Sequence, residues 1–262
     1  MAPADVASLG ASLGAALRGR LIEAGARSGL TEGAFAFSLI VPERGTALGH
    51  NAERSFYPCG VVKMFWLIAC LSRLAEGAIE AHAELDRALH DMIVWSSNTA
   101  TNYVINLLSC TTGDTLLGAR EFAAWSERRQ WANRCFRTLD WPEMAVVNVC
   151  QKSLDNDRYG RERQFVGLGR DNPNQLIAAA TARLLVEIFA GETLPEAIRR
   201  GAAALLPRPH DAAWDEAHQH GQVRGYFGAG LPADVRFAVC PTSALWRDIL
   251  DDDPTVPARR CH

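Results

Sequence analysis

Lysine is almost absent from this sequence. Of the 27 basic residues, 25 are arginine, which leaves only Lys63 and Lys152. The sequence has no run of basic residues and a formal net charge of -3, which argues against nucleic acid as a partner. The longest uninterrupted apolar run, from Met64 to Leu71, is too short to cross a bilayer. We therefore expect a globular chain with neither a nucleic-acid nor a membrane partner.

The sequence also lacks any paired cysteine motif. It has an odd number of cysteines, and none forms a C-x-x-C pair, which argues against a disulfide framework and against a zinc site. The cysteines are Cys59, Cys70, Cys110, Cys135, Cys150, Cys240 and Cys261. The N-terminus has neither the basic region nor the apolar region of a secretory signal. We expect reduced cysteines, no cofactor, no metal and a cytoplasmic location, with a periplasmic or secreted location if this N-terminus is processed or edited.

Hydrophobic residues make up 48% of the chain and charged residues 22%, which is typical of a globular protein with a sizeable core. We predict an α+β fold in a single domain over residues 1–246, followed by an irregular tail over 247–262. The domain has three parts: an N-terminal helix and strands (4–56), a helical region (57–210) and a late strand (225–245).

Hydrophobic periodicity and turn residues predict the individual elements. Helices are expected at 4–29, 60–76, 81–95, 103–108, 113–139, 176–190 and 194–206, and strands at 34–42, 46–51 and 235–240. Residues 140–174 show no clear period and are rich in charged and turn residues. A run of this length inside one domain is more typical of a functional loop than of a linker.

The helix that starts near Gly60 is the central element of this prediction. It is apolar on nearly every face, as expected of a helix in the middle of a domain. Its N-terminal half has one charge, Lys63, and i,i+3 spacing places Lys63 on the same face as Gly60. Arginine stays protonated, whereas a desolvated lysine can lose its proton and act as a base. The alternative is that Lys63 extends along the helix until its amine reaches water.

The order of several motifs resembles the penicillin-recognising serine hydrolases, above all the class A β-lactamases. Residues 56–63, Phe-Tyr-Pro-Cys-Gly-Val-Val-Lys, resemble aromatic-Pro-x-Ser-x-x-Lys, and residues 96–100, Ser-Ser-Asn-Thr-Ala, resemble Ser-Asp-Asn-Thr-Ala. Residues 191–194 are similar to the Gly-Glu-x-Leu that ends a later helix. The resemblance covers roughly residues 30–240. It implies an antiparallel sheet from both chain ends plus an all-helical region.

The resemblance also implies a reaction and the residues that perform it. Members of the family hydrolyse or transfer an amide or ester through an acyl-serine, so the implied substrate is a small or peptide-like amide or ester. A serine at the start of a buried helix lies beside backbone N–H groups that stabilise an oxyanion. By position, Lys63 would be the base or proton relay, Ser96 the proton shuttle and Asn98 the group that orients the substrate amide.

The sequence departs from the family at several of these positions. Gly60 occupies the nucleophile position, and glycine cannot form an acyl-enzyme. Ser97 replaces the central Asp of the second motif. No Lys-Thr-Gly is present, and residues 240–242, Cys-Pro-Thr, stand at that position. Glu143 and Glu162 are the candidates for the deacylating glutamate. The stretch after residue 240 is shorter than the closing strands and terminal helix of the family.

We therefore predict a serine hydrolase family member that is inactive or impaired because Gly60 lacks a side chain. One alternative is a binding or regulatory protein that uses the retained pocket without turnover. Another is an active hydrolase that uses Cys59, at a helix N-terminus near Lys63, or a water activated by Lys63. A decayed or engineered Ser→Gly variant would have the same sequence. His218 and His220 are interpreted as part of a solvated loop, and substrate identity and oligomeric state are left open.

Overall fold

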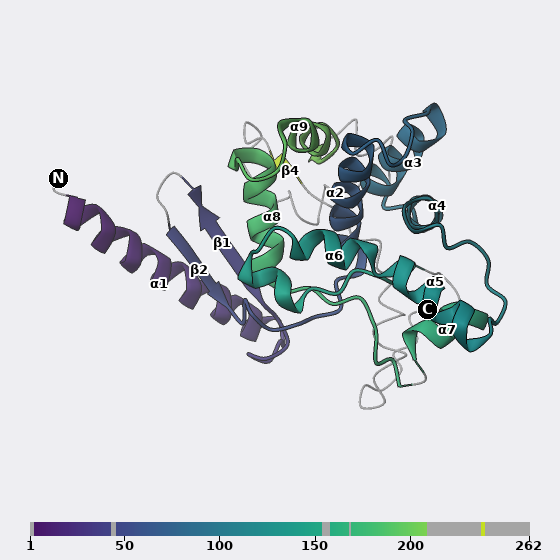
Figure 1. Cartoon of the computed structure of the whole chain (residues 1–262). Helices are drawn as coiled ribbons and strands as arrows, with labels where there is room; N and C mark the ends of the chain where they lie inside the picture. Colours follow the sequence, from purple (N-terminus) through teal and green to yellow (C-terminus); the bar gives the residue numbers. More distant parts are fainter. Residues whose placement is uncertain (1–2, 43–45, 154–157, 168, 209–236, 239–262) are drawn as a thin grey trace.

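The computed structural model describes residues 3–42, 46–153, 158–167, 169–208 and 237–238. Helices form most of this part of the chain, and a two-stranded sheet lies between the long N-terminal helix and the remaining helices (Figure 1). The helices are α1 Pro3–Arg27, α2 Val62–Ala75, α3 Ala83–Val94, α4 Asn98–Ser109, α5 Ala119–Arg129, α6 Trp131–Arg137, α7 Gly160–Val166, α8 Ala178–Ala190 and α9 Glu196–Leu205. The 3-10 helices are η2 Cys59–Val61 and η3 Pro142–Val146, and the strands are β1 Phe37–Val41, β2 Thr46–His50, β3 Pro207–Arg208 and β4 Phe237–Ala238.

The strands form two small antiparallel sheets. β1 pairs with β2, with Phe37 opposite His50 and Val41 opposite Thr46, and β3 pairs with β4. Helix α1 lies against β2, and α8 lies against β1 (Figure 1). The fold is therefore α+β with antiparallel strands from both parts of the chain, as predicted. In the described residues, β1 and β2 form one sheet and β3 and β4 form the other, so no N-terminal strand pairs with a C-terminal strand.

Helix α2 is the centre of the core, as the sequence predicts. Every residue from Val62 to Cys70 has a relative exposure of 1% or less. Helices α3, α4, α6 and α9 all pack against it. A helix surrounded on all sides in this way can be apolar on every face, because none of its faces meets water.

Two of the predicted helices have different boundaries in the structure. Residues 113–139 were expected to form one helix, but they form α5 and α6, and α5 begins only at Ala119. Gly113 has a φ of 84°, a left-handed backbone that cannot belong to an α-helix. Helix α4 begins at Asn98, five positions before the predicted start at residue 103, because the Ser97 side chain caps it by accepting from the Ala100 N–H at 3.2 Å.

The segment 140–174 has more regular structure than its sequence indicates. It contains η3 and the seven-residue helix α7, neither of which was predicted. Helix α7 is short and rich in charged residues, so it shows no clear apolar period. Its position depends on a buried ion pair with α5, described below, which periodicity cannot indicate.

Several predictions fall on residues outside the described part of the chain. They concern residues 240–242, His218, His220, the tail 247–262 and most of the predicted strand 235–240, of which β4 is the described portion. Among the residues that the structure does describe, no helix combines the length and apolar character needed to cross a membrane.

Burial should separate the cysteines by reactivity. It raises the pKa of the Cys70 and Cys150 thiols to about 12, whereas Cys110 is exposed. Only the thiolate is nucleophilic, so in native protein at about pH 8 iodoacetamide should modify Cys110 and leave Cys70 and Cys150 intact until the chain is unfolded. Peptide mass spectrometry after timed labelling measures this. Modification of Cys70 as fast as Cys110 would contradict the burial of α2.

Candidate active site

Lys63 connects two segments that are distant in the sequence. Its Nζ donates to the Ser96 backbone carbonyl at 2.5 Å, contacts Ser96 Oγ at 2.8 Å and donates to Asn98 Oδ1 at 2.8 Å. Lys63 lies in the first turn of α2, whereas Ser96 and Asn98 lie at the start of α4. The structure therefore brings together the three side chains to which the sequence analysis assigned polar roles.

This cluster is shielded from water. The relative exposure of Lys63 is 1% and that of Ser96 is 3%. The alternative that Lys63 extends to solvent is therefore wrong, because its amine ends among acceptors from α4 inside the protein. Burying an amine is costly unless hydrogen bonds compensate for lost hydration, and these three short contacts provide that compensation.

Two residues at the cluster have an unusual backbone. Ser96 has a φ of 52° and Cys59 a φ of 47°. Both lie in the left-handed region that residues other than glycine, Asn and Asp rarely adopt. Such strain persists only where surrounding contacts impose it, and it is common at functional sites. At Ser96 it is imposed between the end of α3 and the cap of α4. It holds the Ser96 hydroxyl toward Lys63.

Gly60 lies three residues before Lys63, in the 3-10 turn that leads into α2. It is buried, and the turn continues directly into the helix through the Val62 N–H, which donates to the Gly60 carbonyl. A 3-10 backbone is open to any L-residue, so the local conformation does not require glycine. Cys59 is partly buried and begins the same turn.

Asn102 links this site to the long segment that precedes α7. Its Nδ2 donates to the Ser153 carbonyl at 2.7 Å, and its Oδ1 accepts from the Ser153 N–H at 3.0 Å. Asn102 is one helical turn beyond Asn98, so both project from the same side of α4. The sequence analysis did not identify Asn102, which lies two residues beyond the second motif. Its i,i+4 spacing from Asn98 is the signal that could have identified it.

A second asparagine holds the same segment from the other side. Asn174 Oδ1 accepts from the backbone N–H groups of Cys150 at 3.0 Å and Gln151 at 2.8 Å, and its Nδ2 donates to the Gln151 carbonyl at 3.1 Å. Asn174 is buried, with a relative exposure of 3%. Together with Asn102 it fixes the backbone of residues 150–153 beside α4, so this part of the predicted loop has a defined place at the site.

The two candidate deacylating glutamates are bound elsewhere. Glu143 pairs with Arg183 of α8, with Nη1 to Oε2 at 2.8 Å. Glu162 pairs with Arg129 of α5 at 2.8 Å and with Lys152 at 3.2 Å. The segment that Asn102 fixes beside α4 contains Ser153 and neither of these carboxylates. Glu162 is better explained as a structural ion pair than as a catalytic base.

The cluster can move a proton but lacks an attacking atom at position 60. The Ser96 hydroxyl can accept a hydrogen bond from an ammonium or donate one to a neutral amine, so a proton can pass between Lys63 and Ser96. Asn98 adds an amide that can orient a substrate. In the described part of the chain, no group of three or more His, Cys, Asp or Glu side chains is placed to hold a metal ion.

Similarity to solved structures shows the fold of this chain. A variant of the class A β-lactamase of the last common ancestor of Gram-negative bacteria aligns with a TM-score of 0.51 and 22% identity, covering 84% of this chain and 76% of that chain. An ancestral class A β-lactamase gives a TM-score of 0.50 and 20% identity, covering 83% and 76%. No protein-family model matches the sequence, and no curated protein does. The chain therefore has a β-lactamase-like α+β fold, which confirms the predicted fold class.

Proposed function

We propose that this chain is a member of the serine hydrolase family to which class A β-lactamases belong, and that it lacks turnover because Gly60 occupies the nucleophile position. Lys63 lies three residues after that glycine. The observation that supports the proposal best is the contact of its Nζ with Ser96 Oγ and Asn98 Oδ1. The ancestral reaction would be hydrolysis or transfer of an amide or ester acyl group through an acyl-serine.

Each retained group has a task in that reaction. A serine at position 60 would attack the carbonyl carbon while Lys63 removes its hydroxyl proton. Ser96 would pass a proton to the leaving nitrogen, and Asn98 would hold the substrate amide. Backbone N–H groups at the start of a helix stabilise the oxyanion. With Gly60 the attacking oxygen is missing, and the other groups lack the bond-forming atom.

Restoring that oxygen should restore acylation. We expect Gly60→Ser to form a one-to-one covalent adduct with at least one β-lactam or activated ester, whereas the unmodified chain forms none. The measurement is intact mass after incubation with a panel of both compound classes. Gly60→Ala is the matched control, because it adds the same Cβ without the hydroxyl. Because Glu143 and Glu162 are bound elsewhere, the adduct should also persist for lack of a deacylating base.

The other outcomes of this experiment overturn the proposal in different ways. An adduct on the unmodified chain would show that it is active, and peptide mapping would test Cys59 or Ser96 as the nucleophile. If none of the three proteins forms an adduct although circular dichroism shows that all are folded, the chain shares the fold of the hydrolases and not their reaction.

A second candidate function is ligand binding without turnover at the Lys63 cluster. The burial of Lys63 and the left-handed backbone of Ser96 favour it. Each costs free energy in the folded state, and features of this kind are common at sites that bind a ligand. Under this alternative, the unmodified chain binds an amide or carboxylate ligand and releases no product. Calorimetry of the binding, with chromatography of the recovered ligand, distinguishes it from an active enzyme.

A further inference from the structure

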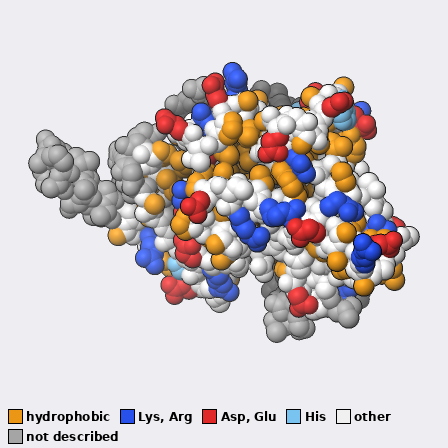
Figure 2. Space-filling model, viewed as in Figure 1, with side chains coloured by type: hydrophobic (Ala, Val, Ile, Leu, Met, Phe, Trp, Pro, Cys, Tyr) orange, Lys and Arg blue, Asp and Glu red, His pale blue; other side chains and the backbone are white. Residues whose placement is uncertain are grey.

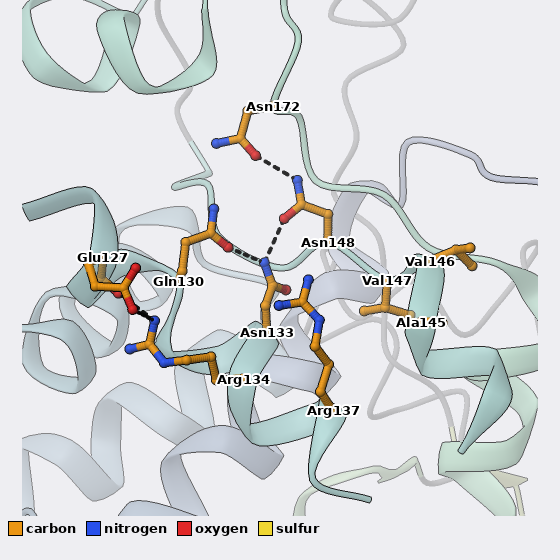
Figure 3. A pocket seen from close by; sticks show the side chains of 10 residues that line it. All are labelled: Glu127, Gln130, Asn133, Arg134, Arg137, Ala145, Val146, Val147, Asn148 and Asn172. Carbon is orange, nitrogen blue, oxygen red and sulfur yellow. Dashed lines mark hydrogen bonds and ion pairs between the residues drawn. The ribbon is translucent and has the colours of Figure 1, made fainter. Parts of the chain in front are cut away.

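A pocket of about 470 Å³ lies between α6 and the segment that follows it, with Asn172 from the far end of that segment at its edge (Figure 3). None of the residues of the Lys63 cluster lines it. Its volume is within the range of small-molecule pockets, roughly 300–1,000 Å³. One side is formed by amide side chains and the other by Ala145, Val146 and Val147.

The amide side is organised by its own hydrogen bonds. Asn133 Nδ2 donates to Gln130 Oε1 at 2.5 Å and to Asn148 Oδ1 at 2.7 Å, and Asn148 Nδ2 donates to Asn172 Oδ1 at 2.9 Å (Figure 3). Asn133 is 2% exposed, and its Oδ1 accepts from the Val149 N–H at 2.6 Å. These bonds hold four side chains, from α6, its N-cap and two loops, in one arrangement, so this side of the pocket is formed in advance.

Two arginines of α6 line the pocket, and they differ in their partners. Arg134 pairs with Glu127 at 2.5 Å. The Arg137 side chain extends into the pocket beside Asn133 (Figure 3). Within the described residues it has neither an ion pair nor a hydrogen bond. The lining therefore has one uncompensated positive charge. On the face seen in Figure 2, basic and acidic side chains are interspersed.

A guanidinium without a partner is suited to an oxyanion. Its planar N–H groups match a carboxylate or a phosphate with two parallel hydrogen bonds. Gln130 Nε2, which has no hydrogen-bond partner in the described part of the chain, adds a neutral donor to the lining. Opposite them, Val147 is buried and Val146 is 50% exposed, so the pocket offers apolar surface to a carbon skeleton.

We propose that this pocket binds a small organic anion. Its carboxylate or phosphate group pairs with Arg137 and Gln130, and its apolar part lies against Val146 and Val147. The site is independent of the Lys63 cluster and of the function proposed for that cluster, because the two share no lining residue.

The test is isothermal titration calorimetry of the full chain at constant ionic strength with benzoate, phenyl phosphate, inorganic phosphate and benzyl alcohol. Benzoate or phenyl phosphate should bind saturably. Inorganic phosphate should bind more weakly because it has no apolar part, and benzyl alcohol because it has no anionic group. Arg137→Gln should weaken the best ligand by about tenfold or more. Arg128→Gln is the matched control, because Arg128 is exposed on the neighbouring α5 and does not line the pocket.

The anion that binds more tightly identifies whether a carboxylate or a phosphate is preferred, and either preference supports the site. The proposal is overturned if neither organic anion binds, or if benzyl alcohol binds as tightly as they do. Equal weakening by Arg137→Gln and Arg128→Gln would also overturn it, since the effect would then be one of net charge. Melting curves of both variants show that they are folded, as expected for changes at exposed positions.

Discussion

Replacing Glu162 by alanine should lower the free energy of unfolding by about 3–5 kcal/mol. Glu162 accepts two parallel hydrogen bonds from Arg129, at 3.0 and 2.8 Å, and its Oε1 lies 3.2 Å from Lys152 Nζ. Arg129 has no exposed surface and is stacked over Trp125 at 4.5 Å. Without Glu162, two positive charges would remain together in a largely buried place.

Urea or thermal unfolding followed by circular dichroism measures this loss. Glu127→Ala is the matched control, since it breaks an ion pair with Arg134 at a site where both side chains are largely exposed. Exposed pairs contribute at most about 1 kcal/mol, so the control should be far milder. A Glu162→Ala loss as small as that of Glu127→Ala would show that the buried pair does not hold α7 to α5.

The double variant Arg129→Met/Glu162→Leu tests the cause of this loss. It removes both partners of the bidentate pair and replaces them with apolar side chains of similar size. Much of the stability lost in Glu162→Ala should return, because an unpaired buried charge costs more than the absence of the pair. The two proteins are compared by the same unfolding measurement.

In the Gly60→Ser background, Lys63→Met should slow formation of the covalent adduct by about 10²–10⁴-fold. Methionine fills a similar volume but cannot accept the proton of the serine hydroxyl. The measurement is the rate of adduct formation by intact mass under single-turnover conditions. The free energy of unfolding should also fall, because the Ser96 carbonyl and Asn98 Oδ1 lose the Lys63 donor, so the rate is compared only after circular dichroism shows that the variant is folded.

The control for this rate is Arg128→Gln in the same Gly60→Ser background, which removes a cation at an exposed position on α5. It should leave the rate unchanged. If Lys63→Met reacts as fast as its parent, Lys63 is a structural amine, and another group activates the introduced serine. If Gly60→Ser itself forms no adduct, the hydrolase proposal fails first, so the two failures are distinguishable.

The sequence alone determined the features that depend on local pattern. The run from Met64 to Leu71 is apolar on every face, which predicts a central helix, and α2 is that helix. The spacing of Gly60 and Lys63 and the motif beginning at Ser96 predicted the fold class, which the similarity to solved β-lactamases confirms. Local pattern was enough here because each motif lies at the start of one helix.

Only the tertiary structure decided which polar side chains meet. Glu143 and Glu162 were equivalent in the sequence, but the structure places Glu143 in an ion pair with Arg183 of α8 and Glu162 in an ion pair with Arg129 of α5. Asn102 was overlooked, because its partner, Ser153, is 51 residues away. Hydrogen bonds and buried charges depend on distances between segments that no period within one segment encodes. The same holds for the pocket beside Arg137, whose amide wall is assembled from three separate parts of the chain.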